Sequence, residues 1–449
     1  MSPKFTPQAL LHIIRSFPPT ERYWVAYSGG LDSHVLLQAL AAVRSALPAP
    51  LAACHVNHGL SERAAEWARH CRGVCAGLGV EFHEFTVDAA APRGESQEAW
   101  SRTLRYGVFR KQLGVRHMLL TAHQADDQAE TLLLQLLRGA GPAGLAAMPA
   151  VDKFDRGWHA RPLLGFSRNE LREYAQAAGL HWVEDESNLD LRFDRNFIRH
   201  AVMPRLQERW PGLTATLGRA AVLQSEAAEL LTQLAGMDMQ DCYEPASGIL
   251  QLDCLISLAP ERQRNLLRHW IKFRGLPVPD QRQLQAILTD LIPAREDAMP
   301  CVRWPGGEIR RYRGGLYAVA PLPDTDGQAA RLWDLAQTLD LPLGQLNASR
   351  QHGRGLRTGD AEVRVQFREG GESIRRRGHG HHQQLKKLFQ AYGVPPWLRA
   401  YVPMLYVNDR LASVAGVWLE EEFAAGEDEE GWQIEWSAAE EVFGTDSKQ

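Results

Sequence analysis

Residues 23–37 read YWVAYSGGLDSHVLL, and this stretch decides the class of fold. The apolar run Trp24 to Tyr27 predicts a buried strand, and a helical pattern begins at His34 after the hexapeptide SGGLDS. A glycine pair between a strand and a helix lets backbone N–H groups approach an anion, and the helix N-terminus adds partial positive charge. The stretch therefore predicts an α/β fold with a phosphate site at the hexapeptide.

An aspartate in this loop separates it from the kinase type of nucleotide loop. A Walker A loop ends in Gly-Lys-Ser/Thr, and this one has no lysine. The carboxylate of Asp32 would repel a phosphate unless a divalent cation lay between them, so we expect Mg²⁺ here. The alternative is an ordinary glycine turn capped by a polar side chain. The candidate phosphate-binding residues are Ser28, Gly29, Gly30, Leu31, Asp32 and Ser33.

Short apolar runs and longer helical patterns alternate over the first two hundred residues. Further strands are predicted at 51–56, 80–87 and 117–121, and helices at 34–46, 61–78, 97–113 and 125–138. Helical stretches of this length between strands imply parallel crossovers. We therefore expect an α/β N-terminal domain with a doubly wound, mostly parallel sheet.

The rest of the chain has a different pattern. Helices at 213–234, 260–273 and 280–288, with a β-hairpin at 303–320, predict a mainly helical domain. Strands at 363–368, 404–407 and 411–417, with a helix at 384–391, predict a small α+β domain. The predicted divisions are 1–212, 213–320, a linker at 321–350, a C-terminal domain at 351–422 and an acidic tail at 423–449.

Composition narrows the class of protein. A length of 449 residues favours several domains, and 45% hydrophobic with 23% charged residues is typical of soluble globular proteins. The six cysteines are few and irregularly spaced, so we expect a reducing compartment and a core that needs no disulfide. No apolar run is long enough for a signal sequence or a membrane span, which predicts a cytoplasmic protein without a membrane partner.

Charge is unevenly distributed although the net charge is only −4. Residues 351–400 hold ten Lys/Arg against four Asp/Glu, whereas residues 420–449 hold eleven acidic residues and one lysine. A basic segment of this kind is a candidate nucleic-acid footprint; a solvated surface followed by a disordered tail is the alternative. The candidate nucleic-acid-binding residues are Arg375, Arg376, Arg377, Lys386 and Lys387.

A second polar cluster, TAHQADDQAET at 121–131, follows the strand at 117–121 and opens a helix. On a helix His123, Asp127 and Glu130 would share one face, at spacings of four and three residues. Ligands of open α/β sheets bind beyond the carboxyl ends of the strands, where SGGLDS also lies. The cluster could therefore hold a metal ion or a cationic amine, although simple helix-dipole partners are the alternative.

The motifs occur in an order that resembles one family. SGGLDS is similar to the PP-loop of the N-type ATP pyrophosphatases, which cleave ATP to AMP and pyrophosphate. The whole set resembles the tRNA(Ile)-lysidine synthetase family over nearly the full chain. That set comprises SGGLDS, HVNHGLS (55–61), TAHQADDQAETLLLQLLRGAG (121–141), RPLL (161–164), DESN (185–188), DRNFIR (194–199), KKLFQ (386–390) and VPPW (394–397).

The resemblance implies a two-step reaction on the wobble cytidine of an isoleucine tRNA with a CAU anticodon. ATP, with Mg²⁺ near Asp32, would adenylate the C2 oxygen of the cytosine. The ε-amine of free L-lysine would then attack C2 and release AMP, changing the codon read from AUG to AUA. The domain at 1–212 would be the catalytic PP-loop domain, 213–320 a tRNA-binding domain, and 351–422 a domain for the tRNA acceptor stem.

The resemblance also implies roles for single residues. The lysine site maps onto Asp127, Glu130 and Arg195, where carboxylates can hold an ammonium and a guanidinium can pair with a carboxylate. The predicted catalytic residues are Asp32, His123 and Arg105. Arg102 remains open as an alternative to Arg105 for neutralising phosphate charge. His55 is predicted to contact ATP, with packing of its ring as the alternative.

Two other functions are compatible with parts of the sequence. A PP-loop tRNA sulfurtransferase would need cysteines for sulfur relay or an iron–sulfur cluster, but Cys71 and Cys75 form no CxxC motif and are expected to be buried. A non-catalytic tRNA-binding protein would tolerate loss of Asp32 and Asp127, which this chain retains.

Overall fold

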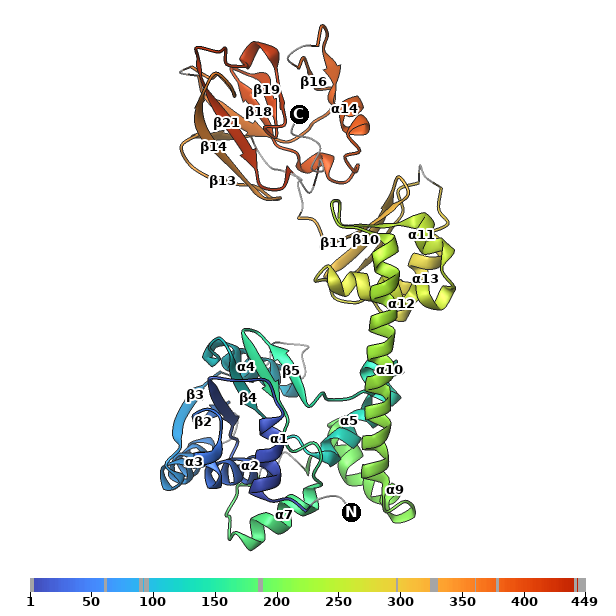
Figure 1. Ribbon diagram of the computed structural model, residues 1–449. Coiled ribbons are helices and arrows are strands. Elements are labelled where there is room, and N and C mark those ends of the chain that lie inside the picture. Colours follow the sequence, from blue (N-terminus) through green and yellow to red (C-terminus); the bar gives the residue numbers. More distant parts are fainter. Residues whose placement is uncertain are drawn as a thin grey trace. The chain divides into compact units, whose positions relative to one another are not determined.

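The computed structural model describes residues 4–59, 63–88, 92, 97–184, 189–295, 298–323, 330–359, 361–376, 379–439 and 442. The chain divides into two compact units, Met1–Leu230 and Leu231–Gln449 (Figure 1). No helix in the described ranges has both the length and the apolar character needed to cross a bilayer.

The first unit is built on a six-stranded sheet in the order β3-β2-β1-β4-β6-β5. Its strands are β1 (Arg22–Ala26), β2 (Leu51–Asn57), β3 (Glu81–Thr86), β4 (His117–Leu120), β5 (Val151–Phe154) and β6 (Gly157–Ala160). Five of these strands are parallel, and only β5 runs antiparallel, beside β6. The predicted doubly wound, mostly parallel sheet is confirmed, and the β5–β6 hairpin is an addition that the sequence analysis lacked.

Helices cover both faces of this sheet (Figure 1). The helices of this part of the chain are α1 (Pro7–Arg15), α2 (Leu31–Ala42), α3 (Ala64–Leu78), α4 (Gln97–Gln112), α5 (Ala125–Leu137), α6 (Pro142–Leu145) and α7 (Arg168–Ala177). Because side chains alternate along a strand, Val25 packs with Leu36 and Cys71 on one face, while Trp24 packs with Phe109 on the other. The core of the unit is thus two apolar layers separated by the sheet.

The start of α2 differs from the prediction for a local steric reason. Gly29 has φ +85°, and a Cβ placed there would come within 2.9 Å of the Cys71 sulfur. Gly30 is the N-cap, so the helix begins at Leu31 rather than at His34. Only glycine adopts this backbone without strain, and Asp32 and Ser33 therefore lie in the first helical turn.

The end of the first unit packs against α5. It contains α8 (Asp194–Phe197), a π-helical turn (Ile198–Val202), α9 (Met203–Arg209) and the first part of α10 (Leu213–Cys242). Ala129 of α5 shares a small buried cluster with Ile198 and Met203, and Leu217 of α10 packs on it. This cluster holds the segment 194–199 beside α5, whose N-terminal end carries the predicted acidic site.

The next part of the chain combines helices with a sheet. The helices are α11 (Leu252–Ser257), α12 (Pro260–Phe273) and α13 (Gln281–Ala286). The sheet has the order β7-β8-β11-β10-β9, with strands β7 (Tyr243–Glu244), β8 (Ile249–Gln251), β9 (Cys301–Trp304), β10 (Gly307–Tyr312) and β11 (Gly315–Val319). The predicted helix at 260–273 is confirmed, whereas the predicted hairpin at 303–320 is one part of a five-stranded antiparallel sheet.

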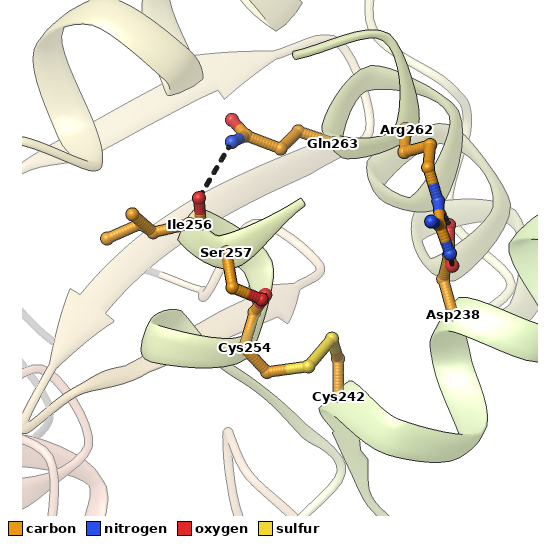
Figure 2. Close-up of a disulfide and its surroundings, with 7 residues drawn as sticks. All are labelled: Asp238, Cys242, Cys254, Ile256, Ser257, Arg262 and Gln263. Carbon is orange, nitrogen blue, oxygen red and sulfur yellow. Dashed lines mark hydrogen bonds and ion pairs between the residues drawn. A yellow bond between two sulfur atoms is a disulfide. The ribbon is translucent and has the colours of Figure 1, made fainter. Parts of the chain in front are cut away.

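The structure contains one disulfide among the described residues, although the sequence analysis expected a reducing compartment and a core that needs none. Cys242 at the end of α10 bonds to Cys254 of α11, with their Cα atoms 5.3 Å apart (Figure 2). Near it, Arg262 of α12 forms an ion pair with the buried Asp238 of α10. The chain reverses through β7 and β8 between the two cysteines, and irregular cysteine spacing alone could not reveal that return.

The C-terminal part holds two main sheets, β12-β15-β18-β19-β20 and β13-β14-β21, with a short β16–β17 pair. The strands are β12 (Arg331–Trp333), β13 (Leu339–Asp340), β14 (Gln345–His352), β15 (Val363–Gln366), β16 (Ser373–Ile374), β17 (Gln383–Gln384), β18 (Met404–Val407), β19 (Arg410–Val414), β20 (Trp418–Leu419) and β21 (Glu430–Trp436). The helix α14 (Leu385–Ala391) confirms the one predicted at 384–391. Together they form an α+β arrangement around one core.

Two segments were assigned the wrong character. The predicted linker at 321–350 contains β12, β13 and most of β14, and the predicted acidic tail at 423–449 contains β21. β21 pairs with β14 over seven residues, and Ile434 and Trp436 are buried. Apolar residues alternate with polar ones along 432–436, but the surrounding acidic residues concealed this strand pattern. The domain boundaries themselves remain predictions.

Replacing Ile434 by alanine should destabilise the β14–β21 pair by about 2–4 kcal/mol, because the side chain is only 5% exposed. Glu435→Ala, an exposed position on the same strand, is the matched control and should cost less than about 0.5 kcal/mol. The measurement is urea unfolding of each variant, monitored by hydrogen exchange of peptides that cover 345–352 and 430–436. Equal midpoints for the two variants would contradict a folded β21.

Candidate active site

The loop after β1 is held in place by its own hydroxyl groups. The Ser33 hydroxyl donates to the Gly30 carbonyl at 3.0 Å and accepts from the Ser28 backbone N–H at 3.2 Å. The Ser28 and Ser33 hydroxyls lie 3.0 Å apart. From the other side, the Val183 N–H donates to the Gly29 carbonyl at 3.0 Å. The loop is therefore preorganised at the N-terminus of α2, as an anion site requires.

Asp32, in the first turn of α2, has an unsatisfied carboxylate oxygen. Its Oδ1 is buried and has no hydrogen-bond partner among the described residues. Burial and, to a smaller extent, the nearby Asp127 raise the pKa of Asp32 to about 6, while Arg168 and Arg199 oppose the shift. A buried, unpartnered carboxylate oxygen beside a second carboxylate fits a divalent cation.

The donor set suits Mg²⁺ in particular. The described residues contain no group of three or more His, Cys, Asp or Glu side chains placed to hold a metal. Mg²⁺ is commonly bound by one or two carboxylates together with phosphate oxygens and water, so it needs no such cage. Asp32 at the phosphate loop provides that kind of partial site.

At the N-terminus of α5, the adjacent Asp126 and Asp127 have different hydrogen-bond partners. Oδ2 of Asp127 accepts from the Gln124 N–H at 3.1 Å and so completes a capping box. Asp126 accepts from the Arg168 N–H at 2.9 Å and from the Thr214 hydroxyl at 3.3 Å. Asp126 thus ties α5 to α7 and α10, whereas Oδ1 of Asp127 contacts two arginines of the site, Arg195 and Arg199.

Four charged side chains meet beside this cap. Arg195 contacts Asp127 through Nη2 and Glu130 through Nε, each at 3.1 Å. Arg199 contacts the same two carboxylates, through Nη2 and Nε respectively, each at 2.7 Å. Glu130 is only 2% exposed. We call Asp127, Glu130, Arg195 and Arg199 the four-charge cluster; its formal charges cancel.

Arg199 is the member that the sequence analysis missed. Burial opposes its charge, but its hydrogen bonds to Glu130 and the attraction of both carboxylates raise the pKa of Arg199 well above its usual range. Arg195 and Arg199 are four residues apart in DRNFIR, a spacing that places side chains on one helical face. That spacing was the available signal. Asp127, Glu130 and Arg195 were predicted to lie together, and the structure brings them together.

His123 lies near the cluster but not on the helix. The helix α5 begins at Ala125, so the predicted shared helical face of His123, Asp127 and Glu130 is wrong in geometry. His123 occupies the short connection after β4, and its Nδ1 lies 2.9 Å from the Thr121 hydroxyl. Burial lowers the pKa of His123 to about 3, so its ring is neutral at physiological pH.

The two arginines that the sequence left open lie in different surroundings. Arg102 stacks its guanidinium over the Tyr106 ring at 5.0 Å and helps to lower the pKa of His123. Arg105 acts instead on His58, whose pKa is lowered first by burial and then by this charge. Arg102 is therefore the one whose charge reaches the predicted catalytic histidine, and the role of Arg105 stays a prediction.

His55 and the cysteines have packing roles in the structure. The buried His55 ring donates from Nδ1 to the Tyr27 carbonyl at 2.9 Å, and its predicted contact with ATP stays a prediction. Cys71 and Cys75 are fully buried, as expected. Burial raises the pKa of each thiol to about 12, which disfavours the reactive thiolate form.

The predicted nucleic-acid-binding residues divide into engaged and exposed groups. Arg375 forms an ion pair with Glu421 at 3.2 Å, and Arg376 donates to the Tyr392 hydroxyl at 2.7 Å. Arg377 lies outside the described residues. The two lysines, Lys386 and Lys387, are exposed on α14, and neither has an ion-pair partner within the described part of the chain.

Asp32→Asn should stabilise the protein at neutral pH when ATP and Mg²⁺ are absent. The folded protein binds the Asp32 proton more tightly than the unfolded chain, so stability falls as pH rises through about 4 to 6. Removing the charge should therefore raise Tm increasingly over that window and stabilise the folded protein by on the order of 1–3 kcal/mol at pH 7.

Thermal melts between pH 4 and 8 check this expectation. Asp155→Asn, in an exposed turn, controls for loss of one negative charge. A difference between Asp32→Asn and wild type that does not grow with pH would contradict a buried, unpaired carboxylate.

Three family models match the chain. They are the PP-loop domain over residues 4–206, the TilS substrate binding domain over 250–317 and the TilS substrate C-terminal domain over 363–436. A solved structure, the U34-tRNA thiolase NcsA from Methanococcus maripaludis with its [4Fe-4S] cluster, matches with a TM-score of 0.42 and 15% identity. That match covers 49% of this chain and 77% of that chain.

Curated relatives match over almost the full length. The tRNA(Ile)-lysidine synthase of Coxiella burnetii is 42% identical over 435 residues, which is 96% of this chain and 96% of that protein. The tRNA(Ile)-lysidine synthase of Methylococcus capsulatus is 41% identical over 427 residues, which is 93% of this chain and 97% of that protein. The chain therefore belongs to the tRNA(Ile)-lysidine synthase family.

Proposed function

We propose that this chain ligates free L-lysine to C2 of the wobble cytidine in a CAU-anticodon isoleucine tRNA. The reaction consumes ATP with Mg²⁺ and releases AMP and pyrophosphate, and we expect it in the cytoplasm, where these substrates occur. The observation that carries the proposal is the electrostatic proximity of Asp32 in the phosphate loop to Asp127 in the four-charge cluster. A nucleotide-phosphate site and an amine site adjoin each other.

The first step is adenylation of the cytosine. The loop Ser28–Ser33 holds the phosphates of ATP at the N-terminus of α2. Mg²⁺, when bound at Asp32, neutralises phosphate charge. The C2 oxygen of the cytosine attacks the α-phosphate and pyrophosphate leaves, with Arg102 or Arg105 balancing the negative charge that develops.

The second step uses the four-charge cluster to receive lysine. The carboxylates of Asp127 and Glu130 attract the substrate ammonium, and Arg195 pairs with the substrate carboxylate through its planar fork. Both carboxylates are already engaged, so one guanidinium must move. Arg199 makes the shorter contacts, at 2.7 Å against 3.1 Å for Arg195. Arg195 is accordingly the mobile member, and Arg199 remains as the counter-charge.

Retaining one arginine makes the site suitable for a cation. With Arg195 turned toward the substrate, Asp127, Glu130 and Arg199 carry a net charge of −1, which favours an ammonium. Without Arg199 the two neighbouring carboxylates would repel each other with no counter-charge between them. Arg199 therefore supplies the positive charge that offsets this repulsion before the substrate arrives.

The sulfurtransferase alternative receives little support from the cysteines. Cys71 and Cys75 pack in the apolar core beneath the phosphate loop, and their raised pKa values disfavour sulfur transfer. A non-catalytic tRNA-binding protein is distinguished from a ligase by a direct assay.

The assay combines the purified chain with ATP, radiolabelled lysine and an unmodified CAU isoleucine tRNA transcript. Wild type should incorporate lysine, and Asp32→Ala should abolish both pyrophosphate release and incorporation. Arg195→Ala should preserve pyrophosphate release but raise the KM for lysine about 10- to 100-fold, the size expected for a lost charge-assisted hydrogen bond.

Each possible result of that assay tests one candidate function or one residue assignment. No incorporation by wild type, or incorporation unaffected by Asp32→Ala, would refute the ligase. A thiolated tRNA product would favour the sulfurtransferase. An equal loss of pyrophosphate release and lysine use in Arg195→Ala would contradict its assignment to the lysine site.

Lys386→Ala together with Lys387→Ala should weaken tRNA binding and reduce the slope of log affinity against log salt by about 1 to 2, because up to two phosphate contacts disappear. The matched control is Arg364→Ala with Arg410→Ala. These two arginines lie in the same region but are already paired with Asp409 and Glu422. Filter binding at several salt concentrations measures the slopes, and equal effects of both double variants would contradict a specific role for the lysines.

A further inference from the structure

A row of four polar side chains runs from the interior of the first unit to His123. Arg161 Nη2 lies 3.1 Å from Nδ1 of His159, and Nε2 of His159 lies 2.8 Å from the Thr121 hydroxyl. The same hydroxyl lies 2.9 Å from Nδ1 of His123. Arg161, His159 and Thr121 are each less than 10% exposed. The proposed reaction leaves these three buried side chains without a role.

The direction of each hydrogen bond follows from the chemistry of the groups. A guanidinium is only a donor, so Nδ1 of His159 must accept from Arg161. Burial and the charge of Arg161 lower the pKa of His159 to about 3, so its ring is neutral and has one proton. That proton must be on Nε2, which therefore donates to the Thr121 hydroxyl.

The Thr121 hydroxyl accepts from His159 and therefore donates its own proton to His123. It has one proton, and Nδ1 of His123 is the acceptor that the described residues offer it. If His123 carried its proton on Nδ1, the buried hydroxyl would receive two donors and have no acceptor of its own. Since His123 is neutral, the arrangement leaves its proton on Nε2.

The backbone makes this row rigid. Ala160 of β6 pairs with Leu120 of β4, and the Thr121 N–H donates to the Ala160 carbonyl at 3.0 Å. Arg161 is anchored by its Nη1, which donates to the Pro149 carbonyl at 2.7 Å. The residues therefore project from adjacent ends of parallel strands, at the edge of the sheet that also carries the phosphate loop.

We propose that Arg161, His159 and Thr121 are positioning residues that hold His123 as the Nε2–H tautomer, so that His123 donates a hydrogen bond to a substrate oxygen and does not act as a base. The hydrogen bond from His123 to a substrate oxygen rests on the proposed ligase function. A fixed N–H donor stabilises negative charge that develops on a phosphate or cytosine oxygen. Because His123 then acts as a donor and not as a base, the proton released by the attacking amine is taken up by another group.

The charges around His123 support a neutral donor. Burial is the main reason for its low pKa, Asp127 opposes the shift, and Arg161, Arg195 and Arg102 add to it. Nε2 of His123 has no hydrogen-bond partner among the described residues, and it is not one of the buried unpartnered atoms. It is therefore open to a ligand.

The test measures the tautomer directly. Two-bond ¹H–¹⁵N NMR correlations of the full chain with ¹⁵N-labelled histidine distinguish Nε2–H from Nδ1–H rings, and His123→Gln and His159→Gln spectra assign the two signals. Both rings should be neutral Nε2–H at pH 7. Thr121→Val should abolish the single tautomer of His123 and lower kcat for lysine transfer about tenfold, with the KM values for ATP and lysine nearly unchanged. Thr121→Ser keeps the hydroxyl and should behave as wild type.

The readouts separate this inference from the proposed function. An Nδ1–H tautomer of His123, or a Thr121→Val variant with unchanged tautomer or unchanged kcat, would overturn the inference. Absence of lysine incorporation in wild type would instead refute the ligase, while the NMR result would still decide the tautomer. Circular dichroism and tRNA affinity of Thr121→Val establish that the variant is folded.

Discussion

The pairing of β1 with β2 on one side and β4 on the other is the constraint on which the site depends. After β1 the chain forms the neighbour on one side, β2, and it later forms the neighbour on the other side, β4. The loops that follow β1 and β4 therefore diverge from the same edge of the parallel sheet. The loop after β1 is SGGLDS, and the connection after β4 carries His123 and the start of α5. Because β6 pairs next to β4, Arg161 also reaches this edge.

The treatment of buried charge divides the site into two parts. In the four-charge cluster every carboxylate has guanidinium partners, which offset part of the cost of burying its charge. Asp32 has an unpartnered buried oxygen and a raised pKa. An uncompensated acid gains most from a cation, whereas a compensated pair can exchange one cation for another. The first arrangement suits a metal with phosphates, and the second suits an amine substrate.

The same pairing principle changes how the C-terminal charges are interpreted. Acidic residues of the segment 420–449 are partners of basic residues in the domain: Glu421 contacts Arg375, Glu422 contacts Arg410, and Glu429 contacts Arg357. Counting charges along the sequence therefore overstates both the basic face and the acidic tail. Among the described candidate residues, Lys386 and Lys387 are exposed on α14 and have no acidic partner, and they lie on the side of the helix away from the buried Leu385 and Leu388.

The sequence by itself determined what local chemistry can specify: the strand–loop–helix of SGGLDS, the alternation that makes a parallel sheet, and the acidic cap that contains Asp127 and Glu130. Turn geometry and side-chain periodicity are short-range, so they can be read from neighbouring residues. Only the tertiary structure decided that Arg199 completes the four-charge cluster, that His159 and Arg161 stand behind His123, and that β21 pairs with β14. It also decided the Cys242–Cys254 bond. These contacts join residues that come together only when strand order and helix packing are set, because their energies depend on distance and burial rather than on sequence spacing.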